Sequence, residues 1–210
     1  PETLPPERRR RGSARLLIEG YASLLTNARF LGPALCAGCM FGGMFAYISG
    51  TPFIYIEYFH VPPERYGLLF GLNVLGMLGM ATINSRIVLK VGTGRLLRLG
   101  ISVAAVAAVA LVATATSGLG GLVGIVIPLF FYISMVGIIG SNPTAASLAD
   151  VPHLAGTAAA LIGTLQFGLG AIAGAAVGTL ADGTPVPMAG VICSMALAGS
   201  FFGLVLIRRR

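Results

Sequence analysis

Residues 156–180 read GTAAALIGTLQFGLGAIAGAAVGTL and contain no Lys, Arg, Asp or Glu. A helix rises about 1.5 Å per residue, so about 20 apolar residues suffice to cross roughly 30 Å of hydrocarbon. A strand of a transmembrane β-barrel would instead alternate apolar and polar residues over a short segment. The continuous run of Gly, Ala and Leu therefore predicts a transmembrane helix.

Five similar stretches accompany this one, and they predict the domain organisation. The predicted spans cover residues 30–50, 66–84, 99–117, 119–140, 156–180 and 186–207. Hydrophobic residues make up 56% of the 210 positions and charged residues only 10%, whereas a soluble domain carries about 25% charged residues. The mean hydropathy is +0.89. We therefore predict an all-α membrane protein with a six-helix transmembrane domain over residues 30–210.

The segment before the first span, residues 1–29, is rich in Arg and bounded by Pro. It has no apolar core of the kind that a signal peptide requires. Apolar residues recur in it at helical spacing, at Leu16, Leu17, Tyr21, Leu24 and Leu25. This pattern predicts a cytoplasmic linker with an amphipathic helix along the inner membrane surface, and we expect a further segment upstream of it.

The basic residues predict the orientation in the membrane. Of the 14 Lys and Arg residues, only Arg65 falls between the first and second spans; the others precede the first span, separate the second from the third, or follow the sixth. Lys and Arg are retained on the cytoplasmic side during insertion. We therefore expect both termini in the cytoplasm, with the net charge of +7 facing anionic lipid headgroups rather than nucleic acid.

Motifs that would indicate an enzyme, a metal site or a cofactor site are incomplete in this sequence. Cys36 and Cys39 have the spacing of a zinc or redox pair, but they lie inside an apolar span without a second ligand pair. Gly92 and Gly94 resemble the start of a dinucleotide-binding loop, but Leu97 stands where a third Gly is needed. We predict no enzymatic activity, no cofactor and no metal.

Small and polar residues within the spans point to helix packing and to a central cavity. Gly38 and Gly42 are four residues apart, which lets helix backbones approach closely. Amides such as Asn73 and Gln166 are costly in lipid, so they should face a cavity or another helix. The third and sixth spans carry few polar residues, and we expect these two to face lipid.

Four segments, taken in order, resemble a known family of transporters. They are FAYISGTPFIYIEYF (45–59), YGLLFGLNVLG (66–76), NSRIVLKVGTGRLLRLG (84–100) and AGTAAALIGTLQFGLGAIAG (155–174). Together they make the chain similar to the C-terminal half of a major facilitator superfamily transporter of the Bcr/CflA drug:proton antiporter type. The resemblance covers essentially the whole chain.

This resemblance implies half of a twelve-helix fold, built from two inverted three-helix repeats. It implies export of small amphipathic drugs in exchange for protons, by alternating access, in a bacterial inner membrane. It also implies an absent N-terminal six-helix half as partner. Tyr47, Asn73 and Gln166 are the expected contributions of this chain to the substrate cavity, because an aromatic ring and two amides in an apolar wall suit such drugs.

The basic stretch after the second span resembles a cytoplasmic loop motif of the same superfamily, with Asn84, Arg86, Gly92 and Arg95 as its residues. No span carries a carboxylate in its middle, and Glu57 near the end of the first span is expected to be an interfacial charge. Two other classes stay open: a six-helix channel and a structural or accessory membrane protein.

Overall fold

The computed structural model describes residues 14–206, and every regular element among them is a helix. The expectations for residues 1–13 and 207–210, including the terminal Arg clusters, lie outside the described residues. In chain order the elements are α1 (Ala14–Thr26), α2 (Ala28–Pro52), η2 (Phe53–Tyr58), α3 (Pro63–Val91), α4 (Thr93–Ser117), α5 (Gly121–Ile139), α6 (Asn142–Ala149), η3 (Pro152–Leu154), α7 (Ala155–Thr179), α8 (Val186–Phe201) and η4 (Phe202–Leu206).

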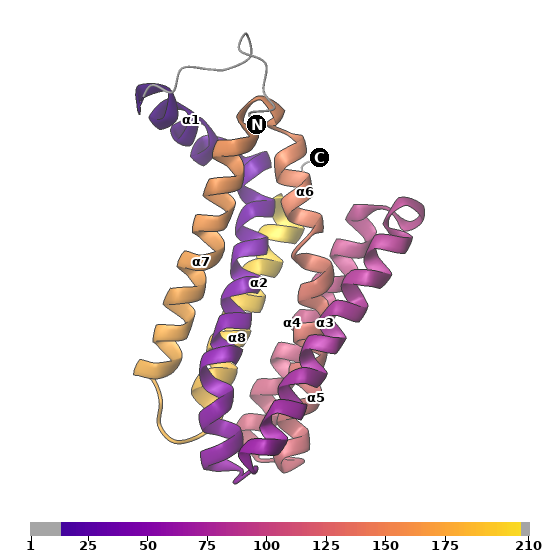
Figure 1. Cartoon of the computed structure of the whole chain (residues 1–210), viewed down its shortest axis with the longest axis vertical. Coiled ribbons are helices and arrows are strands. Elements are labelled where there is room, and N and C mark those ends of the chain that lie inside the picture. Colours follow the sequence, from indigo (N-terminus) through magenta and orange to yellow (C-terminus); the bar gives the residue numbers. More distant parts are fainter. Residues whose placement is uncertain (1–13, 207–210) are drawn as a thin grey trace.

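Six of the helical segments among the described residues are long and apolar enough to cross a membrane. They run side by side as an elongated bundle (Figure 1). The predicted all-α six-helix fold is therefore confirmed. Several helices are longer than the predicted spans, because a helix can continue past its apolar stretch into polar residues. One example is α3, which covers Pro63–Val91 where the prediction was 66–84.

Each of the two sets of three spans in the bundle packs its first helix against the other set. α2 packs mainly against α7 and α8, whereas α5 packs mainly against α3 and α4. The first three spans are α2, α3 and α4, and the last three are α5, α7 and α8. The first helix of each set of three therefore lies against the second and third helices of the other set. In each set the first helix is thus buried mainly by helices of the other set, an arrangement that fits two inverted three-helix repeats.

α2 is the centre of the bundle, and glycines on it allow the close approach of α7. A Cβ atom added at Gly38 would lie 2.9 Å from a methyl carbon of Leu169, and one at Gly42 would lie 3.3 Å from the Leu169 carbonyl oxygen. The predicted role of this glycine pair in helix packing is confirmed. Gly67 and Gly71 differ, since no described atom lies within 4 Å of a Cβ added at either.

Exposure is distributed differently from what the polarity of the spans suggested. The least buried of the six spans is α3, and α7 is also less buried than α4 or α8. Leu68 and Leu75 of α3 are 74% and 68% exposed. The polarity of a span therefore does not report which of its faces lack a neighbour within the described residues. That the third and sixth spans face lipid stays a prediction.

The first helix lies across one end of the bundle (Figure 1). Leu24 of α1 is buried in a small cluster with Phe30, Val151 and Leu161, and Tyr21 packs against the edge of that cluster. Leu25, by contrast, is exposed. Asn27 follows this helix and caps α2, because its side chain accepts hydrogen bonds from the backbone N–H groups of Arg29 and Phe30.

The predicted basic loop after the second span is not a loop. Asn84 and Arg86 lie within α3, Gly92 alone separates α3 from α4, and Arg95 lies in the first turn of α4. Gly92 has φ +89°, a conformation that side-chain-bearing residues rarely adopt, so a single glycine makes the reversal possible. The side chains of Arg86 and Arg95 are exposed.

Asn84 faces the bundle instead and forms a reciprocal amide pair with Asn142 at the start of α6. Nδ2 of Asn142 donates to Oδ1 of Asn84 at 2.9 Å, and Nδ2 of Asn84 donates to Oδ1 of Asn142 at 3.3 Å. Nδ2 of Asn84 also donates to Oγ of Ser141 at 3.2 Å. Both Asn side chains are buried, so the pair joins two helices 58 residues apart in sequence.

We expect Asn84→Ala and Asn142→Ala each to lower the free energy of unfolding by about 1–2 kcal/mol, because each leaves a buried amide without its partner. The double variant should lose less than the sum of the two, since both remove the same interaction. Unfolding in mixed detergent micelles measures all three. Strict additivity would show that the two amides are not coupled.

Candidate functional site

The turn between α2 and α3 brings polar and aromatic side chains of the two helices together. Tyr47, Thr51 and Tyr55 are spaced four residues apart, so they lie on one face of α2 and its continuation η2. Tyr66 and Asn73 of α3 oppose them. We call these five residues the tyrosine–asparagine cluster; the ring of Phe70 packs against two of them, Tyr47 and Tyr66.

Aromatic contacts hold this cluster together across the two helices. Tyr47 stacks on Phe70 with ring centroids 5.6 Å apart and an interplanar angle of 17°. Tyr55 meets Tyr66 edge-on at 6.1 Å, and Tyr66 lies 6.1 Å from Phe70. Offset stacking and edge-on contacts are the arrangements that aromatic quadrupoles favour. The rings therefore fill the space between α2 and α3.

In one pair of hydroxyls of the cluster, the donor and the acceptor can be assigned. The hydroxyl of Thr51 donates to the carbonyl oxygen of Tyr47 at 2.9 Å. A threonine hydroxyl has one proton to donate, so in the contact of 3.3 Å between Thr51 Oγ1 and Tyr66 Oη the tyrosine is the donor. Tyr66 is thereby oriented by the turn that carries Thr51.

Three other polar atoms of the cluster are buried without a hydrogen-bond partner among the described residues. They are Oη of Tyr47, Oη of Tyr55 and Oδ1 of Asn73. Nδ2 of Asn73 donates to the Leu69 carbonyl of its own helix at 2.9 Å. The Asn73 side chain lies close enough to the Tyr47 hydroxyl to act on it as a hydrogen-bonding group, but no hydrogen bond of normal geometry joins them.

Unsatisfied buried polar atoms cost about 1–3 kcal/mol each, so three of them in one place need an explanation. The arrangement offers two hydroxyls, which can donate or accept, and one amide oxygen, which can only accept. Such a set can bind a water molecule or a polar group of a small ligand.

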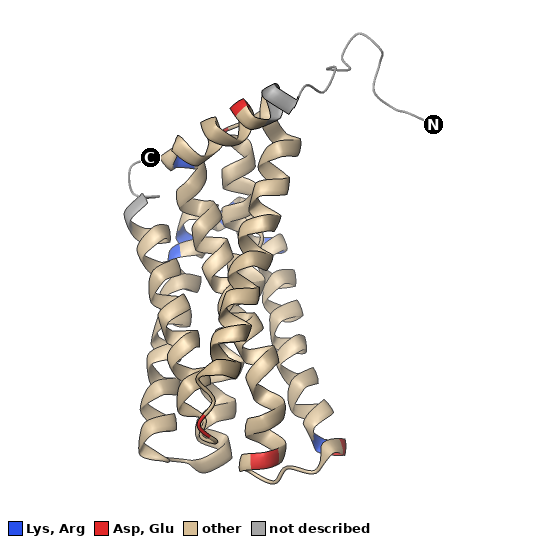
Figure 2. Cartoon of the chain, turned by 90° about the vertical axis from the view of Figure 1, so that its left-hand side faces the viewer, with Lys and Arg blue, Asp and Glu red and all other residues tan. Residues whose placement is uncertain are grey.

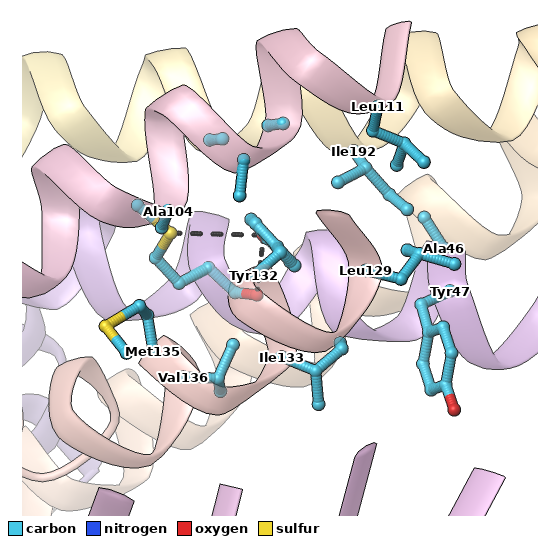
Figure 3. Packing of buried hydrophobic residues seen from close by; sticks show 14 of the residues in the cluster. Ala46, Tyr47, Ala104, Leu111, Leu129, Tyr132, Ile133, Met135, Val136 and Ile192 are labelled. Carbon is cyan, nitrogen blue, oxygen red and sulfur yellow. Dashed lines mark hydrogen bonds between the residues drawn. The ribbon is translucent and has the colours of Figure 1, made fainter. Parts of the chain in front are cut away.

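Tyr132 of α5, unlike Tyr47, has a hydrogen-bond partner for its hydroxyl and is used for packing. Its hydroxyl donates to the Met40 carbonyl oxygen at 3.2 Å, and Gly43 leaves the space for it, since a Cβ there would overlap the hydroxyl. Figure 3 shows Tyr132 among apolar side chains, whereas the hydroxyl of Tyr47 points away from the other labelled residues. Of these two tyrosines, Tyr132 has a hydrogen-bond partner for its hydroxyl, whereas Tyr47 has none of normal geometry among the described residues.

The structure brings two of the three predicted cavity residues together and leaves the third apart. Tyr47 and Asn73 meet in the tyrosine–asparagine cluster. Gln166 lies on α7 and is half-buried; its neighbour Leu165 contacts Gly38 of α2, and Gly170 contacts Phe45. Gln166 is therefore level with a position between residues 38 and 45, about two helical turns before Tyr47 along α2, and its role stays a prediction.

Thr51, Tyr55 and Tyr66 belong to the candidate site but were not predicted. Their four-residue spacing after Tyr47 was a usable signal, because it places Tyr47, Thr51 and Tyr55 on one helix face. What could not be read from the sequence is the register of α3 against α2, which decides that Tyr66 faces this row.

Comparisons with known proteins agree with this architecture. The family model described as Major Facilitator Superfamily matches residues 1–175. An uncharacterized MFS-type transporter of Bacillus subtilis, YdgK, is 36% identical over 205 residues, which cover 97% of this chain and 50% of that protein. A bicyclomycin resistance protein homolog of Haemophilus influenzae is 32% identical over 188 residues, 90% of this chain and 47% of that protein. No solved structure matches significantly.

The chain thus spans about half the length of the curated relatives that it matches. The resemblance read from the four sequence segments is confirmed by the family match, and the predicted absence of enzymatic function agrees with a family of transporters. The match covers most of the six-helix bundle. This chain belongs to the major facilitator superfamily.

Proposed function

We propose that this chain forms half of a twelve-helix exporter of small amphipathic drugs, driven by proton antiport and alternating access. The observation that carries the proposal is the set of three unpartnered polar atoms in the tyrosine–asparagine cluster. A relative named for bicyclomycin resistance supports drugs as the substrate class. In this proposal the hydroxyls of Tyr47 and Tyr55 and the amide of Asn73 take up polar groups of the substrate.

The partner in this proposal is an N-terminal six-helix half, which packs against the uncovered faces of α3 and α7. Leu68 and Leu75 are exposed on α3, and Phe167 and Ile172 are exposed on α7. The proton-binding carboxylate is assigned to that partner half, because the described spans of this chain carry no acidic residue in their middle. Family membership favours this function over a channel or an accessory protein.

The proposal is tested in a drug-sensitive bacterium with two proteins, the chain alone and the chain joined to the N-terminal half of the Bacillus subtilis relative. We expect the joined protein to raise resistance to bicyclomycin or another drug of a panel, and a protonophore to abolish the increase. The chain alone should leave resistance unchanged, since it supplies one wall of the cavity. An abundant joined protein without effect on any drug would refute the proposal.

We also propose a bacterial inner-membrane location with both termini in the cytoplasm. Among the described residues, Arg65 lies in the first turn of α3, at one end of the bundle. The other basic residues lie toward the opposite end, which carries α1: Arg29 near the start of α2, Arg86 and Lys90 near the end of α3, and Arg95 and Arg98 near the start of α4. Figure 2 shows this asymmetry. Retention of positive charge in the cytoplasm supports the assignment.

Labelling of single cysteines tests the orientation, in a background in which the three native cysteines are replaced. Glu64 in the first turn of α3 and Thr93 at the start of α4, just beyond the other end of α3, are both exposed. An impermeant thiol reagent added to intact cells should modify Glu64→Cys and spare Thr93→Cys. Lysed cells provide the control, in which both should react. Modification of Thr93→Cys alone in intact cells would reverse the orientation.

A further inference from the structure

A second hollow lies away from the tyrosine–asparagine cluster, at the end of the bundle where α2 runs into η2. It encloses about 720 Å³ between this turn, the last turns of α7 and the first turn of α8. We call it the η2 pocket. Its volume lies within the roughly 300–1,000 Å³ of small-molecule sites.

The two sites use opposite faces of the same turn. Tyr55 of η2 faces Tyr66 of α3, whereas Ile54, Glu57 and Tyr58 line the η2 pocket. A ligand in the η2 pocket would therefore not contact the tyrosine–asparagine cluster. The pocket is a separate site, and it does not depend on the function proposed above.

Absent side chains account for part of the open space. Gly174, Gly178 and Gly183 line the pocket, and no described atom lies within 4 Å of a Cβ added at Gly178. Gly183 has φ +81°, so the connection between α7 and α8 can turn there without a side chain. A larger residue at position 178 would occupy the hollow without displacing the chain around it.

The walls of the pocket are mainly apolar, and its charges are acidic. Phe53, Val177 and Met188 form apolar surface. The lining contains one carboxylate, that of Glu57, together with His60 and Tyr58, and no Lys or Arg. Phe53 and Tyr58 are 62% and 48% exposed, so their ring faces are available to a ligand. Aromatic faces attract cations.

A second carboxylate is fixed at the rim. Oδ1 of Asp182 accepts hydrogen bonds from the backbone N–H of Thr184 at 2.9 Å and from its hydroxyl at 2.7 Å. Thr184 itself lines the pocket. These hydrogen bonds, the hydroxyl's first, hold the pKa of Asp182 below its ordinary value, so the carboxylate stays ionised at neutral pH.

We propose that the η2 pocket is a binding site for an amphipathic organic cation of drug size. Its apolar body would contact Phe53, Val177 and Met188, and its positive charge would lie near Glu57 and the rim carboxylate of Asp182. Charge selects this occupant over a lipid acyl chain, which would fill the apolar space but gain nothing from the two carboxylates. Tyr58 adds a ring face for the cation.

Binding of radiolabelled tetraphenylphosphonium to the purified chain in detergent tests the site. Tetraphenylborate, with nearly the same shape and the opposite charge, should compete poorly. We expect Glu57→Gln to weaken tetraphenylphosphonium binding about fivefold to tenfold, since a carboxylate near the cation is lost. Glu64→Gln, an acidic residue at the same end of the bundle but outside the lining, is the matched control and should bind normally.

Gly178→Leu provides an independent arm, because it fills the hollow without touching a charge. It should abolish saturable binding, whereas Gly79→Leu, at an equally open glycine of α3, should not. Normal binding by both Glu57→Gln and Gly178→Leu would overturn the proposal. Equal competition by tetraphenylborate would also overturn it, because the pocket would then be an apolar site of the kind that a lipid chain fills.

Discussion

Replacing Gly137 by Ala should prevent stable folding of the bundle. A Cβ at this position would overlap the carbonyl oxygen of Met77 and lie 3.0 Å from the backbone nitrogen of Ala81. Backbone atoms cannot rotate away as a side chain can, so α3 and α5 would have to separate. Overpacking typically costs about 1–3 kcal/mol and occasionally more. A clash with backbone atoms belongs at the upper end, which is a large part of the stability of a typical domain.

A glycine of α3, Gly76, is also needed where α3 crosses α5. A Cβ at Gly76 would overlap the hydroxyl of Ser134 and lie 2.7 Å from the ring of Phe130. One glycine from each helix therefore permits the approach of α3 to α5. In a membrane, where lipid is as apolar as the side chains, such close packing is a main source of helix association.

Gly79→Ala is the matched control on the same helix, since no described atom lies within 4 Å of its added Cβ. Alanine favours a helix over glycine by about 1 kcal/mol, so this variant should be at least as stable as the original chain. Unfolding in mixed micelles and the amount of protein in the membrane measure both variants. Equal stability of Gly137→Ala and Gly79→Ala would show that the α3–α5 contact is looser than described.

The second large effect is expected from Asn73→Leu, which should separate stability from transport. Oδ1 of Asn73 is buried without a partner, and Nδ2 only bonds the Leu69 carbonyl of its own helix. Leucine removes the unsatisfied oxygen, and the Tyr47 hydroxyl beside it has no hydrogen bond of normal geometry to lose, so the free energy of unfolding should stay the same or rise by about 1 kcal/mol. Transport should fall about tenfold if the amide binds substrate.

Resistance and unfolding are measured together for this variant, in the protein that joins the chain to an N-terminal half. Thr82→Val is the control, because Thr82 is exposed on α3 and bonds only the Leu78 carbonyl of its own helix, at 2.8 Å. Its resistance should match that of the unchanged protein. A loss of stability in Asn73→Leu, with all drugs affected in proportion to protein level, would mean that the amide is structural.

The sequence alone determined that this chain forms six membrane-spanning helices. Stretches such as residues 156–180 are too long and too apolar for any other structure in a bilayer, because every backbone group must be satisfied within the segment. The packing role of Gly38 and Gly42 was also predictable, since a four-residue spacing puts both on one face. These properties depend on composition and helical periodicity, which are local.

Only the tertiary structure decided which helix faces meet. The sequence placed Asn84 in a basic loop, but it lies within α3 and pairs with Asn142, 58 residues away. It suggested one role for Tyr47, Asn73 and Gln166, yet only the first two come together. Gly67 and Gly71 have the same spacing as Gly38 and Gly42, but no described atom lies within 4 Å of a Cβ added at either. Rotation and register of one helix against another arise from the summed packing of many side chains, and no local pattern encodes that sum.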